Sequence, residues 1–161
     1  MIDRHGVVSN YNTWGTLVRD AIQQEASLLL DASCSYDEAS RTVTVDVDAS
    51  GIDNIDGKLQ VWLTEDNITD VQMMPDGKAN QQYVHNHVFR TSVNDIWGDD
   101  FKLVTGEVKS QSYTAVLDEK WKAENMSAVV FVYNSTGVLQ AAKAKVIPAA
   151  GDTGSEETDE N

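Results

Sequence analysis

The 161-residue chain is poor in several residue types. It has one cysteine, Cys34, so no disulfide can form within it. Its two prolines, Pro75 and Pro148, leave long stretches free to pair as strands. It has no run of about 18 apolar residues, so the sequence predicts no membrane-spanning helix. These absences indicate one globular domain that is stabilised by a packed core.

Basic residues are also scarce. The 12 Lys and Arg residues face 26 Asp and Glu residues, which gives a net charge of -14. A nucleic-acid partner needs a basic surface, and an anionic membrane surface attracts one, so the sequence argues against both partners. Residues 149–161 carry only acidic charges and are predicted to be a disordered, solubilising tail.

Motifs of catalysis are missing as well. The sequence contains no GxSxG, no phosphate-binding loop, no GxGxxG and no CxxC. Nothing resembles a nucleophile with an arranged base. The sequence therefore predicts no cofactor and gives no positive case for an enzyme.

The polar and apolar residues alternate through most of the chain, with the period of two that is typical of strands. This pattern predicts about seven strands between residues 27 and 147 and an immunoglobulin-like antiparallel β-sandwich. Cys34 falls on the inward face of the first strand, which favours a packed, inert thiol. The predicted strands are SLLLDASCSY, RTVTVDVD, KLQVWLTED, QQYVHNHVFR, SQSYTAVLD, SAVVFVYN and GVLQAAKAKV.

One amphipathic helix is predicted near the start, from about Thr13 to Glu25. It either packs on the sandwich through Trp14, Leu17 and Ala21 or stays loose. Two irregular stretches, at residues 66–80 and 94–102, are expected at one end of the sandwich. Such loops are where a β-sandwich usually binds its partners.

The stretch YVHNHVFR places His85 and His87 one residue apart. In a continuous strand both rings would lie on one face, as a first pair of zinc ligands needs. Tyr83 and Phe89 would share that face, which favours a structural aromatic layer over a metal or catalytic site. A third ligand would have to be one of the nearby acids, and the candidates are Glu65, Asp66, Asp95, Asp99 and Asp100.

Arg90 and Trp97 complete the candidate site. We predict that His85, His87 and Arg90 anchor the loop around Trp97 to the sheet, with Arg90 paired to a nearby carboxylate. An exposed Trp97 would instead indicate a partner surface or a platform on which a carbohydrate stacks.

DVDASGIDNIDG, at residues 46–57, partly matches a calcium-binding EF-hand loop. Asp46 and Asp48 stand at the first and third positions of that loop. Gly57 stands where the bidentate glutamate belongs, so the two aspartates are better explained as the outward face of a strand. They remain weak metal candidates beside His85 and His87.

Several motifs recur here in an order that resembles the outer membrane protein 28-related family of exported Gram-negative bacterial proteins. They are LTED at residues 63–66, Gln72, HNHV at residues 85–88 with Arg90, and Trp97-Gly98. The resemblance spans most of residues 27–147 and says little about activity.

The resemblance implies an exported lipoprotein in which a thioredoxin-like domain often precedes the sandwich. Residues 1–26 would then be the remnant of that domain, followed by the sandwich at 27–148 and the tail at 149–161. Met1 is followed at once by IDRHG, so we expect a piece of a longer precursor. The chain itself has neither a lipid-anchoring cysteine motif nor a redox CxxC.

The sequence favours a non-enzymatic binding or structural module of a bacterial envelope lipoprotein, associated with the outer membrane and active in adhesion or assembly. Its partner would be a protein or a glycan, and any membrane contact would be made by a lipid anchor that this chain lacks. The alternatives are a metal-dependent or redox-assisting envelope enzyme that uses His85 and His87, and a calcium-stabilised adhesin-like module.

Overall fold

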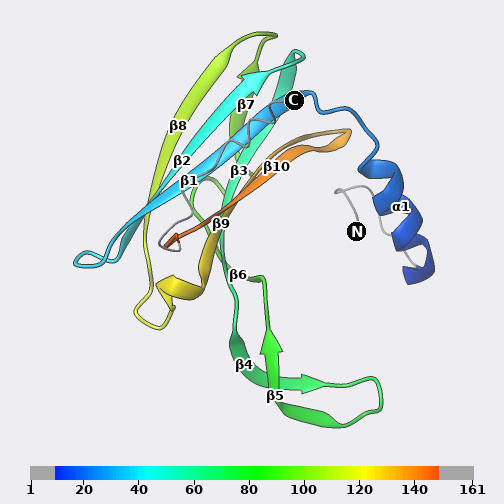
Figure 1. Cartoon of the computed structure of the whole chain (residues 1–161), viewed down its shortest axis with the longest axis vertical. Helices are drawn as coiled ribbons and strands as arrows, with labels where there is room; N and C mark the ends of the chain where they lie inside the picture. The colour runs from blue at the N-terminus through cyan, green and yellow to red at the C-terminus, as the bar shows by residue number, and fades with distance from the viewer. Residues whose placement is uncertain (1–9, 149–161) are drawn as a thin grey trace, which may run out of the picture.

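A computed structural model of the chain describes residues 10–148, which form two packed antiparallel sheets and a separate hairpin (Figure 1). The first sheet has the order β1 (Leu28–Asp37), β2 (Thr42–Gly51) and β8 (Val108–Val116). The second has the order β10 (Gly137–Lys145), β9 (Met126–Asn134), β3 (Ile55–Glu65) and β6 (Val88–Ser92), with β7 (Asp99–Leu103) also paired to β3. The predicted β-sandwich is confirmed.

The core lies between the inward faces of the two sheets. Alternation along β2 buries Val43, Val45 and Val47, as predicted, because successive side chains of a strand point to opposite faces. Leu28 begins β1 fully buried, and Cys34 is half-buried on the same face. Burial raises the pKa of the Cys34 thiol to about 11, so the thiol stays protonated at neutral pH.

The second sheet supplies the other half of the core. Alternation along β3 and β9 points every second apolar side chain at the first sheet. The fully buried residues of these two strands are Leu59, Val61, Leu63, Met126, Ala128, Val130 and Val132. The turn predicted at NSTG joins β9 to β10.

The described residues contain ten strands where the sequence predicted about seven. β4 (Ile68–Met73) lies in a stretch that was expected to be irregular, and so does β7. The strand predicted over residues 81–90 is interrupted, and its halves are β5 (Ala79–His85) and β6. The second sheet uses β6 and β7 in turn to cover the two halves of β3.

The helix is shorter than predicted. A short 3-10 turn, η1 (Tyr11–Thr13), leads into α1 (Trp14–Ala21). No residue of α1 is buried, and Figure 1 shows α1 standing away from the sheets, so the alternative of packing on the sandwich is not what the structure shows. Within residues 10–148, no helix combines the length and the apolar character needed to cross a bilayer.

β4 and β5 pair only with each other and project beyond one end of the sandwich (Figure 1). We call residues 68–85 the arm. The other predicted loop lies elsewhere: residues 93–98 connect β6 to β7 opposite the middle of β3. The expectation that both irregular stretches share one end of the sandwich is therefore wrong, because the second stretch interrupts a sheet edge.

Candidate functional site

The chain enters the arm between β3 and β4 and leaves it between β5 and β6, and both strands are interrupted side by side where the arm leaves the sandwich. Asn67 and His87 have positive φ angles of 60° and 57°, in the left-handed region that few residues adopt. Asn86 Oδ1 accepts a hydrogen bond from the Asn67 amide at 3.0 Å, and Asp66 Oδ1 accepts one from the His87 amide at 2.7 Å. Side-chain oxygens thus replace the ladder bonds between β3–β4 and β5–β6. We call residues 65–67 and 86–90 the arm base.

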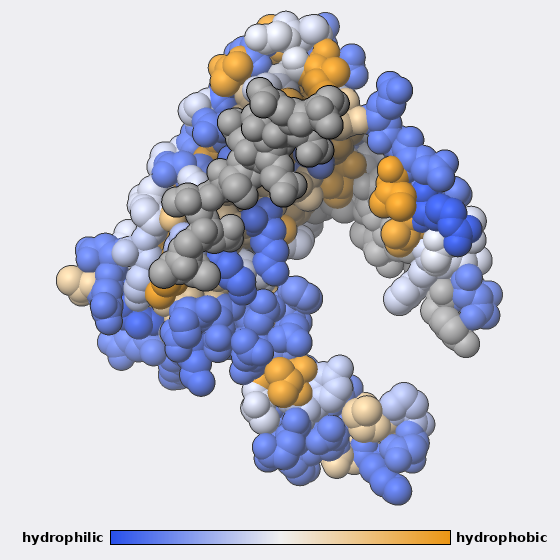
Figure 2. All heavy atoms as spheres, viewed as in Figure 1, coloured by the Kyte–Doolittle hydropathy of each residue, from blue (hydrophilic) through white to orange (hydrophobic). Residues whose placement is uncertain are grey.

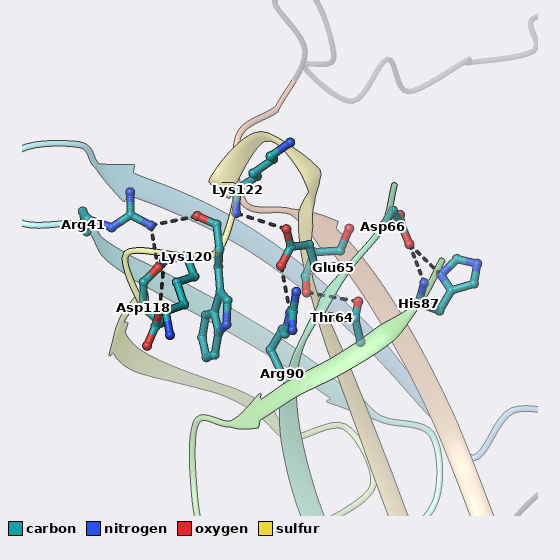
Figure 3. Close-up of polar contacts among 11 residues, drawn as sticks. Arg41, Thr64, Glu65, Asp66, His87, Arg90, Asp118, Lys120 and Lys122 are labelled. Atoms are coloured by element: carbon teal, nitrogen blue, oxygen red, sulfur yellow. Dashed lines mark hydrogen bonds and ion pairs between the residues drawn. The ribbon is translucent and has the colours of Figure 1, made fainter. Parts of the chain in front are cut away.

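Asp66 is the electrostatic centre of the arm base (Figure 3). Its Oδ1 lies 3.2 Å from His87 Nδ1, and its Oδ2 lies 3.9 Å from Lys143 Nζ and 3.5 Å from Lys145 Nζ. The backbone N–H of His87, and then the ammonium groups of Lys143 and Lys145, hold the pKa of Asp66 below its usual value, against the opposing effect of desolvation. The carboxylate therefore stays charged and ties the arm base to β10.

Glu65 is the buried member of the arm base, with a side chain that is 3% exposed. Its Oε2 accepts a hydrogen bond from Arg90 Nε at 2.8 Å, and its Oε1 accepts one from the Lys122 amide at 3.1 Å (Figure 3). The Arg90 guanidinium also lies 5.9 Å from the ring centre of Trp121. A buried carboxylate needs such partners, so this ion pair fixes β6 to β3. The predicted pairing of Arg90 with a nearby carboxylate is confirmed.

The loop that carries Trp121 connects the arm base to the first sheet. Arg41, next to β2, donates from Nη2 to the carbonyls of Asp118 at 2.8 Å and Trp121 at 2.9 Å (Figure 3). The following turn, η2 (Ala123–Asn125), contacts the arm base directly. The Asn125 carbonyl accepts from the Asp66 amide at 3.0 Å. The arm is therefore attached to both sheets.

The two histidines do not form the predicted chelating pair. His85 ends β5, half-buried, with its ring 4.8 Å from the Tyr83 ring in an edge-on contact. The His87 side chain is 72% exposed and pairs with Asp66. The break at Asn86 and the positive φ of His87 end the alternation that would have put both rings on one face. Within the described part of the chain, no group of three His, Cys, Asp or Glu residues is placed to hold a metal ion.

The calcium candidates lie on a regular strand. Asp46 and Asp48 point outward from β2, opposite Ser112 and Ser110 of β8. Asp48 accepts a hydrogen bond from the Ser110 hydroxyl. An EF-hand needs a curled loop at these positions, whereas the backbone here is extended. The outward-face interpretation is the one that the structure supports.

His85, His87 and Arg90 do not anchor the loop around Trp97, because the contacts of His87 and Arg90 run to Asp66 and Glu65 instead. Asn94 and Gln60 hold that loop instead. The Trp97 side chain is 67% exposed, as a residue on a partner surface would be.

The arm has one apolar face and almost no core. Alternation along β4 puts Thr69, Val71 and Met73 on one face, and pairing puts Val84 opposite Thr69 on that face. Val71, Met73 and Val84 are 48%, 61% and 46% exposed. Figure 2 shows apolar side chains at the surface of the arm and of α1, whereas the lower part of the sandwich is mostly hydrophilic.

The sequence did not reveal the roles of Asn67 and Asn86 in the arm base, of Asn125 in η2, or of the buried Gln60. Asn67, Asn86 and Asn125 all take part in the hydrogen bonds that end the strands. Asparagine tolerates a positive φ and bonds readily to nearby backbone, so the pairs Asp66-Asn67 and Asn86-His87 could have signalled a break. Gln60 on an outward position of β3 carries no such signal.

The structure is thus a β-sandwich with a projecting hairpin that polar residues brace at its base. The model of the family described as outer membrane protein Omp28 matches residues 1–149, so the chain belongs to that family and is associated with the outer membrane of the bacterial cell envelope. No curated protein matches the chain.

Solved structures show the same fold. A domain of the outer membrane lipoprotein Omp28 from Porphyromonas gingivalis is 25% identical, with 79% of this chain and 93% of that one covered and a TM-score of 0.55. HBP35 of Porphyromonas gingivalis is 11% identical, with 88% of this chain and 48% of that one covered and a TM-score of 0.66. The sporulation control protein Spo0M of Bacillus subtilis is 13% identical over 74% of this chain and 47% of its own, with a TM-score of 0.50. At these identities the last two show the fold alone.

Proposed function

We propose that the chain is a non-enzymatic binding module of an outer membrane lipoprotein, and that the arm is the element that docks a protein partner. One observation carries the proposal: the arm is a two-stranded hairpin that projects from the sandwich with an exposed apolar face. A two-stranded hairpin is only marginally stable in water and gains stability when a helix or further strands cover it. A partner surface would provide that cover.

The construction of the arm base supports the same role. A flexible loop would need no buried ion pair and no pair of left-handed residues at its root. Glu65, Arg90 and Asp66 instead fix the direction in which the arm leaves the sandwich. Holding a binding element in one orientation lowers the entropy that is lost on association. The motif residues Glu65, Asp66, His87 and Arg90 of the family resemblance are thereby explained as the fastening of the arm.

The enzyme alternative has less support. It requires His85 and His87 to converge with a carboxylate, whereas the break at the arm base separates the two side chains. The calcium alternative requires a loop at residues 46–57, of which β2 and β3 take most as strand. Adhesion or assembly remains the role that a projecting, braced hairpin fits best.

The proposal extends to a lipid anchor and a preceding domain in a longer precursor. The similarity to a Porphyromonas gingivalis outer membrane lipoprotein supports a lipid anchor outside this chain. The apolar stripe of α1, which includes Trp14, Leu17 and Val18, is not buried by the sandwich. This supports the inference that residues 1–26 belong with a preceding, thioredoxin-like domain, ahead of the sandwich at 27–148.

The test compares two substitutions at neighbouring positions of β4 in the full-length protein. Val71→Asp puts a charge on the apolar face of the arm, and Gln72→Asp puts the same charge on the opposite face. After mild detergent extraction of the envelope, we expect the wild type and Gln72→Asp to migrate in a complex with another protein. We expect Val71→Asp to migrate alone, with its thermal unfolding unchanged. A wild type that migrates alone, or a complex that survives Val71→Asp, would refute the proposal.

A further inference from the structure

The loop of residues 93–98 is braced more closely than a connection between two strands requires. It lies where β6 ends and β7 begins, so it interrupts the edge of the second sheet opposite Leu59–Val61. Asn94 replaces the missing ladder with its side chain. Its Nδ2 donates to the Leu59 carbonyl at 2.8 Å, and its Oδ1 accepts from the Val61 amide at 3.0 Å.

Gln60 supports the loop from beneath. It is 1% exposed, and its Nε2 lies within hydrogen-bond distance of Ser92 Oγ at 2.7 Å, Asn94 Oδ1 at 3.2 Å and the Asp95 carbonyl at 3.0 Å. A buried amide that is shared among one acceptor of β6 and two of the loop fixes the loop conformation, because any shift would leave polar groups without partners.

The far side of the loop is fixed by a turn at Gly98. Asp95 Oδ1 accepts from the Trp97 amide at 2.9 Å, and the Asp95 carbonyl accepts from the Gly98 amide at 2.8 Å. Gly98 has a φ of 78°, and a Cβ there would lie 2.6 Å from the Leu59 carbonyl oxygen, so only glycine fits. The Tyr133 hydroxyl donates to the Trp97 carbonyl.

This braced loop presents two large apolar side chains to solvent. Ile96 is 72% exposed and Trp97 is 67% exposed. Interrupting a sheet edge protects it from unwanted pairing, but polar residues at the tip would serve that purpose equally well. A rigid support beneath an exposed tryptophan is instead typical of an interface anchor, which inserts into a pocket at little entropic cost.

The charges around the loop indicate the kind of partner surface that Trp97 would fit. Asp95 lies within the loop and Asp100 follows it, whereas Asp99 lies opposite Leu59 and faces Tyr113 of the first sheet. Lys58 Nζ pairs with Asp100 at 2.6 Å, so Asp95 and Asp100 against this one lysine leave the surroundings of Trp97 with a net negative charge, on a chain of net charge -14. Anionic lipid headgroups and anionic polysaccharides would be repelled by these carboxylates, whereas a basic protein surface would be attracted.

We propose that Ile96 and Trp97 form a second docking surface, separate from the arm, which inserts into an apolar pocket with a basic rim on a protein partner. The proposal does not depend on the function of the arm. It predicts that truncation of Trp97 weakens binding without loss of the fold, because the loop is held by Gln60, Asn94 and Gly98 rather than by the indole.

The experiment uses the full-length protein in intact cells, with the photo-crosslinking residue p-benzoylphenylalanine in place of Ile96. The matched control carries the same residue at Ile22 of the segment after α1, which is 75% exposed. We expect a protein adduct from position 96 in higher yield than from position 22. The adduct protein is identified by mass spectrometry, purified and titrated against the wild type, Trp97→Ala and Trp14→Ala.

Trp97→Ala is expected to weaken the affinity at least about tenfold, as truncation of an interface anchor does, while Trp14→Ala changes it less than about twofold. Thermal unfolding of both variants should match the wild type. The proposal is overturned if position 96 gives no adduct, if the adduct is lipid or polysaccharide, or if Trp97→Ala binds like the wild type.

Discussion

The sandwich and the arm are both built from antiparallel strands, yet they differ in what stabilises them. Strands β3 and β9 bury alternate side chains completely along most of their length, with Leu59, Val61 and Val130 at 0% exposure. In the arm, Val71 and Val84 remain about half exposed at 48% and 46%. The same antiparallel pairing therefore forms a buried core in the sandwich and leaves an exposed surface in the arm. Contacts at the arm base hold the arm in position, and no core within the arm does so.

The largest expected effect comes from breaking the joint between the two regions. Arg90→Ala would leave the Glu65 carboxylate buried without its cation, which costs about 3 kcal/mol of the free energy of unfolding. Urea denaturation measures this loss. Lys102→Ala, which removes an ion pair with Asp56 that is exposed on both sides, should leave the unfolding free energy nearly unchanged.

A double variant sharpens the interpretation of that result. Glu65→Gln combined with Arg90→Ala removes the buried charge together with its partner, so it should recover part of the stability that Arg90→Ala loses. If the double variant is less stable than Arg90→Ala by the full cost of a second independent substitution, the two side chains do not act as a pair.

The comparison itself is tested by the same truncation in both regions. Val61→Ala, in the core of β3, should lower the free energy of unfolding by about 2 kcal/mol, through lost burial and the cavity that remains. Val84→Ala, on the arm, should change it by less than about 0.5 kcal/mol. Equal losses at the two positions, measured by urea denaturation, would mean that the arm has a core of its own.

The sequence predicted the sandwich well and the arm poorly. Val43, Val45 and Val47 alternate with polar residues, and burial on one face of a sheet enforces such a pattern. The arm is exposed on both faces, so ITDVQM and ANQQYVH carry no comparable signal. Alternation predicts His85 and His87 on one face, because the break at Asn86 depends on hydrogen bonds to Asp66 and Asn67, which lie 21 and 19 residues earlier than their partners, between β3 and β4.

The sequence therefore identified individual residues of the candidate site, but not which partners they contact. His87 and Arg90 do serve as fastenings, but of the arm and not of the Trp97 loop. The brace of that loop depends on Gln60, a polar residue on an outward position of a strand, and a sequence gives no reason to expect it buried. Whether such a polar residue is buried depends on its tertiary contacts.

The smallest expected effect concerns pH. The pKa of Asp66 is lowered in the folded state, chiefly by the His87 amide, so the folded state binds a proton there less readily than the unfolded chain does. The contribution of Asp66 to stability is thus complete above the pKa of the unfolded chain, about 3.9, and is lost as the pH falls through the lower folded value. The amide shift of His87 should follow this titration in NMR spectra, with a midpoint below the ordinary Asp value.

Asp66→Asn serves as the control for the pH prediction. It keeps a side-chain oxygen for the His87 amide but has no proton to gain, so the acid transition of the His87 signal should disappear. A transition that persists in Asp66→Asn would assign the titration to another group.

The most direct test of the account is amide hydrogen exchange, followed by residue, in the purified protein and in the complex extracted from the envelope. In the purified protein, amides of the arm should exchange much faster than those of β3 and β9, because little apolar surface covers them. In the complex, the arm amides should become protected while the sandwich amides stay unchanged. An arm that is as protected as the sandwich in the purified protein, or that gains no protection in the complex, would contradict a docking role for the arm.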